Sequence, residues 1–300
     1  MSYILTLVAS TKATPVTEKH FKGIERIIGA YNLKFTSKLI WLDKDIAAEI
    51  AISDDAQSSL IAHLRETLEK DRIDFFVTKN ENRQKKLLLA DMDSTIASSE
   101  TLDELAAYAG IKDKIAEITQ RAMEGELDFH TALRERVGLL KGLKTTALRA
   151  TLDETTLNPG AEIFVQTMRK SGSACVLVSG GFTFFTQNIA DRCGFSFNHG
   201  NRLEIKNDAL TGQVIEPILD KYSKVDFLEH YIKDLNLTTE DCLTIGDGAN
   251  DLPMLKMAGL GIGYHPKAAV KSDIGNCILY GDLTAALYAQ GYSNKHFAAQ

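Results

Sequence analysis

The sequence predicts an α/β protein whose main part is a parallel sheet covered by helices on both faces, preceded by a smaller α+β domain. Three observations support this fold class. Over residues 1–80, strand-like and helix-like apolar spacings follow one another in the order βαββαβ. From Lys86 onward, continuous apolar runs are separated by helical segments, which is typical of parallel strands buried on both faces. A chain of 300 residues, 44% of them hydrophobic, can also bury more than one core.

The N-terminal domain is predicted over residues 1–80. Its order of elements suits a ferredoxin-like sheet with two helices on one face. A polar run at residues 79–86 is typical of a linker, so the boundary is expected near residue 80 and the second domain over residues 81–300. The expected strands cover residues 3–9, 33–42, 47–52 and 74–78, and the expected helices cover residues 16–31 and 56–70.

Three apolar runs of the second domain each end in small or acidic residues. They cover residues 88–95, 174–181 and 242–251. Because ligands bind at the carboxyl ends of parallel strands, a site is expected where these runs end.

Residues 101–156 show helical patterns, with Thr101 and Glu104 matching a capping box, and are predicted to form an inserted helical cap. Turn-like residues at 207–212 predict a β-hairpin.

Charge and cysteine content exclude several classes of protein. The net charge of −6 offers no attraction to phosphate backbones or anionic membranes, so nucleic acid is not an expected partner. No apolar run reaches the ~20 residues of a membrane span, and residues 1–10 lack a basic leader. The four cysteines form no CxxC or Cys/His cluster, so neither a zinc site nor a disulfide framework is expected. Buried free thiols in the cytoplasm are the prediction.

The first acidic pair, Asp91 and Asp93, follows the apolar run directly. Strand alternation would point both side chains the same way. One carboxylate could then attack phosphorus while the other transfers protons. An Asp-rich turn that caps the strand would produce the same residues, and this pair alone does not distinguish the two readings.

A second acidic cluster, Gly246-Asp247-Gly248-Ala249-Asn250-Asp251, also follows an apolar run and precedes a helical pattern. Carboxylates brought together in a cleft repel one another unless a cation intervenes. Mg²⁺ suits them because it takes hard oxygen ligands and is bound by one or two carboxylates plus phosphate oxygens. Taken singly, this cluster could also be a helix cap with turn glycines.

Two further elements could bind phosphate. Ser179 and Gly180 end the run VLVSGG ahead of a helical segment, where a hydroxyl, bare amides and the helix dipole stabilise an anion. A tight strand-to-helix turn accounts for these residues equally well. A lysine must also offset the phosphate charge, and the spacing alone does not choose between Lys221 and Lys224.

These four elements occur in the order of the motifs of the haloacid dehalogenase-like phosphohydrolases, and the resemblance covers residues 86–288. Within that superfamily the chain resembles the phosphoserine phosphatase family. The resemblance is carried by DMDST, the following SSE and the stretch MEGELDFHTALRERVGLLKGL. It implies a Rossmann-like core with a helical cap and Mg²⁺-dependent hydrolysis of O-phospho-L-serine, the last step of serine biosynthesis.

The resemblance also implies catalytic roles. Asp91 is expected to be the nucleophile that becomes an aspartyl phosphate, and Asp93 to protonate the leaving oxygen and then activate water. Lys224 is preferred to Lys221 because Leu228 places an apolar residue four positions on, as in the family helix. The expected metal ligands are Asp91, the main-chain carbonyl of Asp93 and Asp247, with Asp251 supporting the metal's waters. The expected phosphate contacts are Ser179, Gly180 and Asn250.

The substrate's amino-acid end requires recognition by the cap. Glu100 resembles the family's ammonium ligand and Arg134 its carboxylate ligand, where a planar guanidinium can bind two oxygens. Met123 and Phe129 resemble the apolar wall. Without the resemblance, Glu100 is an acid at a helix start and Arg134 belongs to a solvated helix face.

The order of elements in the N-terminal domain resembles ACT-type amino-acid-binding modules. This resemblance implies serine binding and a possible homodimer through that domain. Two alternatives to the main interpretation remain. The enzyme could act on another small phosphate monoester or transfer phosphate to an amino alcohol. Alternatively, the chain could be an amino-acid sensor without catalysis.

Overall fold

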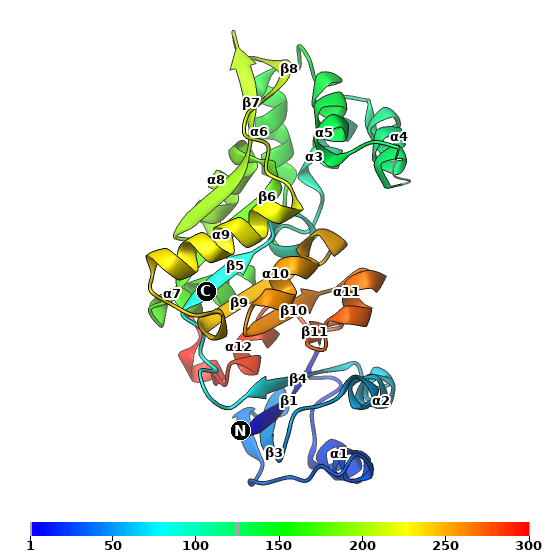
Figure 1. The fold of residues 1–300 in the computed structure, drawn as a ribbon, viewed down its shortest axis with the longest axis vertical. Coiled ribbons are helices and arrows are strands. Elements are labelled where there is room, and N and C mark those ends of the chain that lie inside the picture. Colours follow the sequence, from blue (N-terminus) through cyan, green and yellow to red (C-terminus); the bar gives the residue numbers. More distant parts are fainter. Residues whose placement is uncertain (1, 124–125, 300) are drawn as a thin grey trace.

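The computed structural model describes residues 2–123 and 126–299, without the side chains of Met123 and Lys221, and contains two sheets (Figure 1). One sheet has four antiparallel strands in the order β2-β3-β1-β4. The other has seven strands in the order β11-β10-β9-β5-β6-β7-β8. The predicted α/β class with a separate N-terminal sheet is therefore confirmed. No helix in the described ranges is long and apolar enough to cross a membrane.

The N-terminal sheet has the ferredoxin-like order of elements that the sequence predicts. Its strands and helices are β1 (Tyr3–Ala9), α1 (Glu18–Ala30), β2 (Ile40–Asp43), β3 (Ala47–Ile52), α2 (Ser58–Glu69) and β4 (Ile73–Lys79). The strand β2 is shorter than the predicted residues 33–42. The hydroxyl of Ser37 accepts the Ala51 N–H that a regular ladder would give to a strand carbonyl, so residues before Ile40 pair irregularly.

Both faces of the N-terminal sheet are buried within the chain. The helices α1 and α2 cover one face, with Ile24, Leu60 and Leu64 in its core. On the other face, Val8 and Phe76 belong to the core of the large body. There the sheet contacts α12 (Ala285–Ala289), which lies between the two sheets in Figure 1. The N-terminal sheet is thus packed between its own helices and the C-terminal part of the chain.

The large sheet is parallel except for its last strand. Its strands are β5 (Leu87–Ala90), β6 (Ala174–Phe182), β7 (Phe197–Lys206), β8 (Ala209–Ile215), β9 (Cys242–Gly246), β10 (Leu260–Tyr264) and β11 (Cys277–Ile278). The predicted hairpin is formed by β7 and β8, which pair antiparallel around Asn207 and Asp208. The strand β5 ends at Ala90 because the chain turns there: Ser94 has a φ of 56° and the Ala97 N–H donates to the Met92 carbonyl.

Helices cover both faces of the large sheet. The helices are α7 (Ala161–Lys170), α8 (Thr183–Cys193), α9 (Lys221–Asp234), α10 (Leu252–Met257) and α11 (Ala268–Asp273). Alternation along β5 places Leu88 in the core shared with α7 and α8, and Leu89 in the core shared with α9, α10 and α11. All four cysteines are buried free thiols, as predicted.

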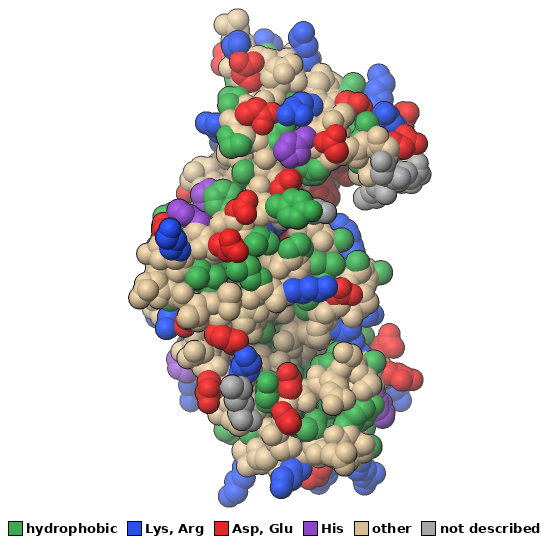
Figure 2. All heavy atoms as spheres, in the orientation of Figure 1, with side chains coloured by type: hydrophobic (Ala, Val, Ile, Leu, Met, Phe, Trp, Pro, Cys, Tyr) green, Lys and Arg blue, Asp and Glu red, His purple; other side chains and the backbone are tan. Residues whose placement is uncertain are grey.

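The helix-rich region predicted at residues 101–156 forms the upper lobe in Figure 1, beside the β7–β8 hairpin. It contains α3 (Thr101–Tyr108), α4 (Lys112–Met123), α5 (Phe129–Gly138) and α6 (Thr145–Glu154). The predicted Thr101–Glu104 capping box is wrong. Glu100 is the residue before the helix, and the Thr101 hydroxyl donates to Asp93 instead. Figure 2 shows the surface hollowed between this lobe and the body of the molecule.

Candidate active site

A cavity of about 200 Å³ lies where β5, β6 and β9 end, under the helical lobe. Parallel strands direct their carboxyl ends to one edge of the sheet, so residues that follow three separate strands meet there. The cavity is lined by Asp91, Asp93, Glu100, Thr101, Leu102, Phe129, Leu133, Arg136, Ser179, Gly180, Gly181, Phe182, Asp247, Asn250 and Lys267.

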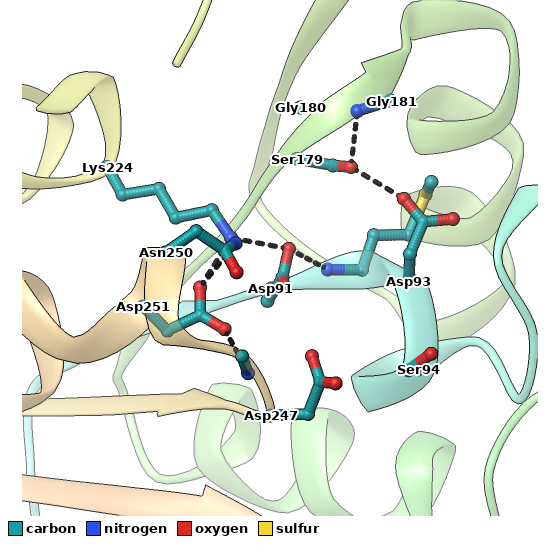
Figure 3. A network of polar contacts seen from close by, with 12 residues as sticks. Asp91, Asp93, Ser94, Ser179, Gly180, Gly181, Lys224, Asp247, Asn250 and Asp251 are labelled. Carbon is teal, nitrogen blue, oxygen red and sulfur yellow. Dashed lines mark hydrogen bonds and ion pairs between the residues drawn. The ribbon is translucent and has the colours of Figure 1, made fainter. Parts of the chain in front are cut away.

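Three buried carboxylates surround one point of this site (Figure 3). Oxygens of Asp91, Asp247 and Asp251 all lie within 4.8 Å of one another. The Asp251 carboxylate approaches the main chain so closely that a Cβ at Gly246 would lie 2.4 Å from it, which explains the glycine at the end of β9. Oxygen ligands at this spacing suit a hard divalent cation.

Lys224 is the cation within the carboxylate cluster. Its side chain is buried, with Nζ 2.7 Å from Asp91 Oδ1 and 2.5 Å from Asp251 Oδ1. Burial opposes the charge on Lys224, but Asp251 and Asp91 outweigh it and raise the pKa of the lysine. Lys267 Nζ also lies 3.0 Å from Asp247 Oδ2, so two lysines face three carboxylates and leave a charge of about −1, which favours a bound cation. The cluster therefore fits such a cation.

The pKa of Asp91 depends on this crowding. Burial and the carboxylate of Asp251 raise the pKa of Asp91, while Lys224 opposes the shift. A divalent cation held between carboxylates lowers their pKa values. Positive partners at this site therefore favour the ionised form of Asp91.

Asp93 lies on the other side of the cavity, where neutral donors surround it. The Thr101 N–H and hydroxyl both donate to Asp93 Oδ1 at 2.8 Å, and the Ser179 hydroxyl donates to Oδ2 at 2.9 Å. The Gly181 N–H donates in turn to Ser179 Oγ at 2.8 Å. Burial nevertheless raises the pKa of Asp93. A raised pKa suits a carboxyl group that gives and takes protons near neutral pH.

The outer part of the cavity carries charges of both signs. Glu100 accepts a hydrogen bond from Ser94 Oγ at 2.9 Å, and burial raises the pKa of Glu100. Arg136 of α5 and Lys267 also line this part. Phe129, at the start of α5, borders this part of the cavity. Its ring lies 3.5 Å from the position that a Cβ at Gly180 would take. An acidic and two basic groups face a space of small-molecule size.

A second cavity of about 430 Å³ adjoins the first and shares Phe129, Gly180 and Asn250 with it. It lies between the start of α5 and the start of α9, where His130 Nε2 is 3.5 Å from Asp220 Oδ2. This contact joins the helical lobe to the helix that carries Lys224. Lys224 and Asn250 also line the second cavity, which therefore lies next to the carboxylate cluster.

The structure brings most of the residues singled out from the sequence to this one place. Asp91, Asp93, Glu100, Phe129, Ser179, Gly180, Asp247 and Asn250 line the first cavity, and Lys224 and Asp251 join the carboxylate cluster. The side chains of Met123 and Lys221 lie outside the described residues. Ser179 lies beside Asp93, where its hydroxyl is occupied as a donor.

Arg134 does not lie in the cavity. Its side chain is 51% exposed and pairs with Glu216. The reason is helical phase: Arg136 follows Phe129 by seven residues, or two turns, and so shares its face, whereas Arg134 does not. The position of Phe129 could have identified Arg136 from the sequence. Lys267 was also missed, because the glycine-rich strand before it gives a weak pattern.

Comparisons with known proteins agree with this geometry. Residues 85–259 match the haloacid dehalogenase-like hydrolase family. The phosphoserine phosphatase of Archaeoglobus fulgidus is 40% identical over 190 residues, which cover 63% of this chain and 55% of that protein. The phosphoserine phosphatase of Methanocaldococcus jannaschii is 38% identical over 205 residues, which cover 68% of this chain and 97% of that protein.

A solved structure resembles almost the whole chain. The HAD family hydrolase of Salmonella enterica serovar Typhi superposes with a TM-score of 0.83 at 30% identity, covering 96% of this chain and 98% of that one. That similarity includes the N-terminal sheet, whereas the chain spans only about half of the Archaeoglobus protein. The chain belongs to the haloacid dehalogenase-like hydrolases, and within them to the phosphoserine phosphatase family.

Proposed function

We propose that the protein hydrolyses O-phospho-L-serine to L-serine and phosphate, with Mg²⁺ as its metal. One observation carries the proposal. Asp91, Asp247 and Asp251 converge with Lys224 beside a cavity that also contains Asp93. The relatives named phosphoserine phosphatase support the choice of substrate.

Mg²⁺ would be held by Asp91, Asp247 and the main-chain carbonyl of Asp93, with Asp251 contacting its waters. When bound, the ion neutralises charge on the phosphate and aligns it for attack. Asp251 suits the outer position because its two oxygens already accept hydrogen bonds from Lys224 and from the Gly248 N–H. The aspartates are the kind of ligand that Mg²⁺ prefers.

Asp91 is the proposed nucleophile. Both hydrogen bonds that the described residues donate to its carboxylate, from Lys224 and from the Met92 N–H, go to Oδ1. Oδ2 is therefore the oxygen we assign to the attack on phosphorus. The new O–P bond forms as the bond between phosphorus and the serine oxygen breaks, giving an aspartyl phosphate. Lys224 orients Asp91 and offsets the repulsion between two anions.

Asp93 is the proposed acid and base. Protonated at first, it gives its proton to the departing serine oxygen. It then takes a proton from the water that attacks the aspartyl phosphate, which restores Asp91 and releases phosphate. Hydrogen bonds from the Thr101 N–H and hydroxyl fix its orientation in both steps. Ser179, Gly180 and Asn250 are the proposed phosphate contacts, and for this the Ser179 hydroxyl would turn from Asp93 to a phosphate oxygen.

The two ends of serine are assigned to the outer cavity. Glu100 would bind the ammonium group, and Phe129 would exclude water from the site. We assign the carboxylate to Arg136 in place of Arg134, because Arg136 lines the cavity and Arg134 pairs with Glu216 outside it. Met123 stays a predicted part of the apolar wall.

An assay of phosphate release, with and without Mg²⁺, tests the proposal. We expect rapid release from phosphoserine and a much lower rate from phosphoethanolamine, which lacks the carboxylate assigned to Arg136. Equal rates would point instead to an enzyme for other small monoesters. Absence of release from any monoester would leave the amino-acid sensor as the function.

We place this activity in the cytoplasm, since the four buried thiols fit a reducing compartment. Serine binding to the N-terminal domain and a homodimer through it stay predictions, as does the domain boundary near residue 80. If such a dimer forms, it must use the sheet edge or the helices, because α12 already contacts the open sheet face.

A further inference from the structure

The segment between β10 and α11, residues 265–267, contacts the active site through Lys267. Lys267, at its end, has Nζ 3.0 Å from Asp247 Oδ2 and 4.0 Å from Glu100 Oε1. Its main-chain N–H donates to the Asp247 carbonyl at 2.9 Å. Lys267 is therefore attached to Asp247 by both its main chain and its side chain.

His265 holds this segment in an unusual conformation. Its φ of 37° lies in the left-handed region, which a residue with a side chain rarely adopts unless its surroundings require it. Its N–H donates to the Ile278 carbonyl at 2.8 Å. Its ring Nε2 is 3.1 Å from the Gly281 carbonyl, and since a carbonyl only accepts, Nε2 must carry the hydrogen. The position of Gly281 therefore helps to set the backbone of His265.

Gly281 is in turn held by Asp74, at the start of β4 in the N-terminal sheet. Asp74 is 2% exposed, and its carboxylate accepts hydrogen bonds from three successive main-chain N–H groups. The donors are Leu279 at 2.7 Å, Tyr280 at 3.2 Å and Gly281 at 2.8 Å. The approach is close, because a Cβ at Gly281 would lie 3.0 Å from Asp74 Oδ2.

We propose that Asp74 is a positioning residue for the active site, which fixes Gly281 and, through His265, the segment that holds Lys267 against Asp247. The proposal rests on the proposed function, in which Asp247 binds the metal. Hydrogen bonds from Asp74 to His265 and from Lys267 to Asp247, connected by the main chain of residues 265–267, join the N-terminal sheet to the proposed metal ligand. Groups behind a ligand commonly fix its orientation. The N-terminal sheet then supports catalysis as well as stability.

Hydrogen–deuterium exchange of the full-length protein tests the proposal directly. The variant Asp74→Ala should accelerate exchange several-fold at residues 265–267, where the Lys267 N–H is bonded to Asp247, because loss of the support opens that segment more often. Exchange in α6 and α8, whose residues do not line the cavity, should not change. This readout requires neither metal nor turnover.

Mg²⁺ binding, measured by calorimetry, gives a second readout. Partners behind a metal ligand commonly contribute about 10- to 100-fold in affinity, so we expect about a 3- to 10-fold loss of Mg²⁺ affinity for Asp74→Ala. An unchanged Mg²⁺ affinity in folded Asp74→Ala would overturn the proposal.

Asn276→Ala is the matched control. The Asn276 side chain joins the same two parts of the molecule by pairing with the Val77 main chain at 2.9 and 3.2 Å, but it makes no bond to Gly281. It should leave exchange at Lys267 and Mg²⁺ affinity within about twofold of the wild type. Equal effects of Asn276→Ala and Asp74→Ala would show that only docking of the sheet matters and would overturn the proposal.

If Asp74→Ala does not fold, Asp74→Asn takes its place, because the amide keeps the shape and one acceptor oxygen and should give a smaller change of the same direction. Unchanged exchange at residues 265–267 in a folded Asp74 variant also overturns the proposal. If the wild type releases no phosphate from phosphoserine, the proposed function fails, whereas exchange at Lys267 still decides the role of Asp74.

Discussion

Arg136→Ala should separate recognition of the serine carboxylate from phosphate chemistry. A charge-assisted hydrogen bond contributes about 1.5–3 kcal/mol. Because Arg136 is only half-buried, the lower part of that range applies, about 1.5–2 kcal/mol. With 1.4 kcal/mol per factor of ten, kcat/KM for phosphoserine should fall about 10- to 30-fold, mainly through KM.

The assay compares two substrates and two arginines. Phosphoethanolamine lacks the carboxylate, so Arg136→Ala should leave its kcat/KM within about twofold of the wild type. Arg134→Ala is the matched control on the same helix, since its side chain pairs with Glu216 and should change neither substrate. Equal losses on both substrates, or a loss of phosphoserine turnover in Arg134→Ala only, would refute the assignment.

Asp91→Asn should abolish phosphate release because an amide is a poor nucleophile, and residual turnover above background in a phosphate assay would contradict its role. Removing divalent cations with a chelator should stop turnover, and added Mg²⁺ should restore it; full activity in the chelator would exclude the metal. Lys224→Met leaves Asp91 and Asp251 without their buried cation and should lower the free energy of unfolding by about 3–5 kcal/mol in metal-free buffer, measured by urea unfolding. Burial raises the pKa of Asp74 to about 6, so the folded protein binds more protons than the unfolded chain between about pH 4 and 6, and stability falls as the pH rises. Relative to Asp74→Asn, whose amide does not titrate, the free energy of unfolding of the wild type should fall by about 3 kcal/mol over this pH range. If the unfolding free energies of the two proteins changed with pH in parallel, the raised pKa of Asp74 would be contradicted.

The positions of the acidic residues could be predicted because each follows a buried strand. Asp91 and Asp247 succeed β5 and β9, which are neighbours in the sheet, and parallel strands end at the same edge. The local pattern of an apolar strand followed by an acidic residue thus predicted that residues far apart in the sequence lie together. Arg134 was chosen from its position in the motif, but helical phase decides which side chain points inward, and the structure places Arg134 outside the cavity, paired with Glu216.

Other features depend on contacts that no local pattern records. The burial of Phe76 follows from its place in a strand, but the sequence does not say that α12 would cover it. The role of Lys267 depends on its closeness to Asp247 and on the left-handed backbone of His265 two residues earlier. Such a backbone is stabilised by partners more than ten residues away, so single-residue preferences cannot indicate it.

The contact between α12 and the first sheet means that the catalytic body is not covered on all sides by its own residues. A fragment beginning at β5 would lack Asp43, which accepts a hydrogen bond from the Tyr288 hydroxyl, and Thr78, which donates to the Ala289 carbonyl. In this protein, the N-terminal sheet cannot be removed or replaced without changing the residues of α12 that contact it.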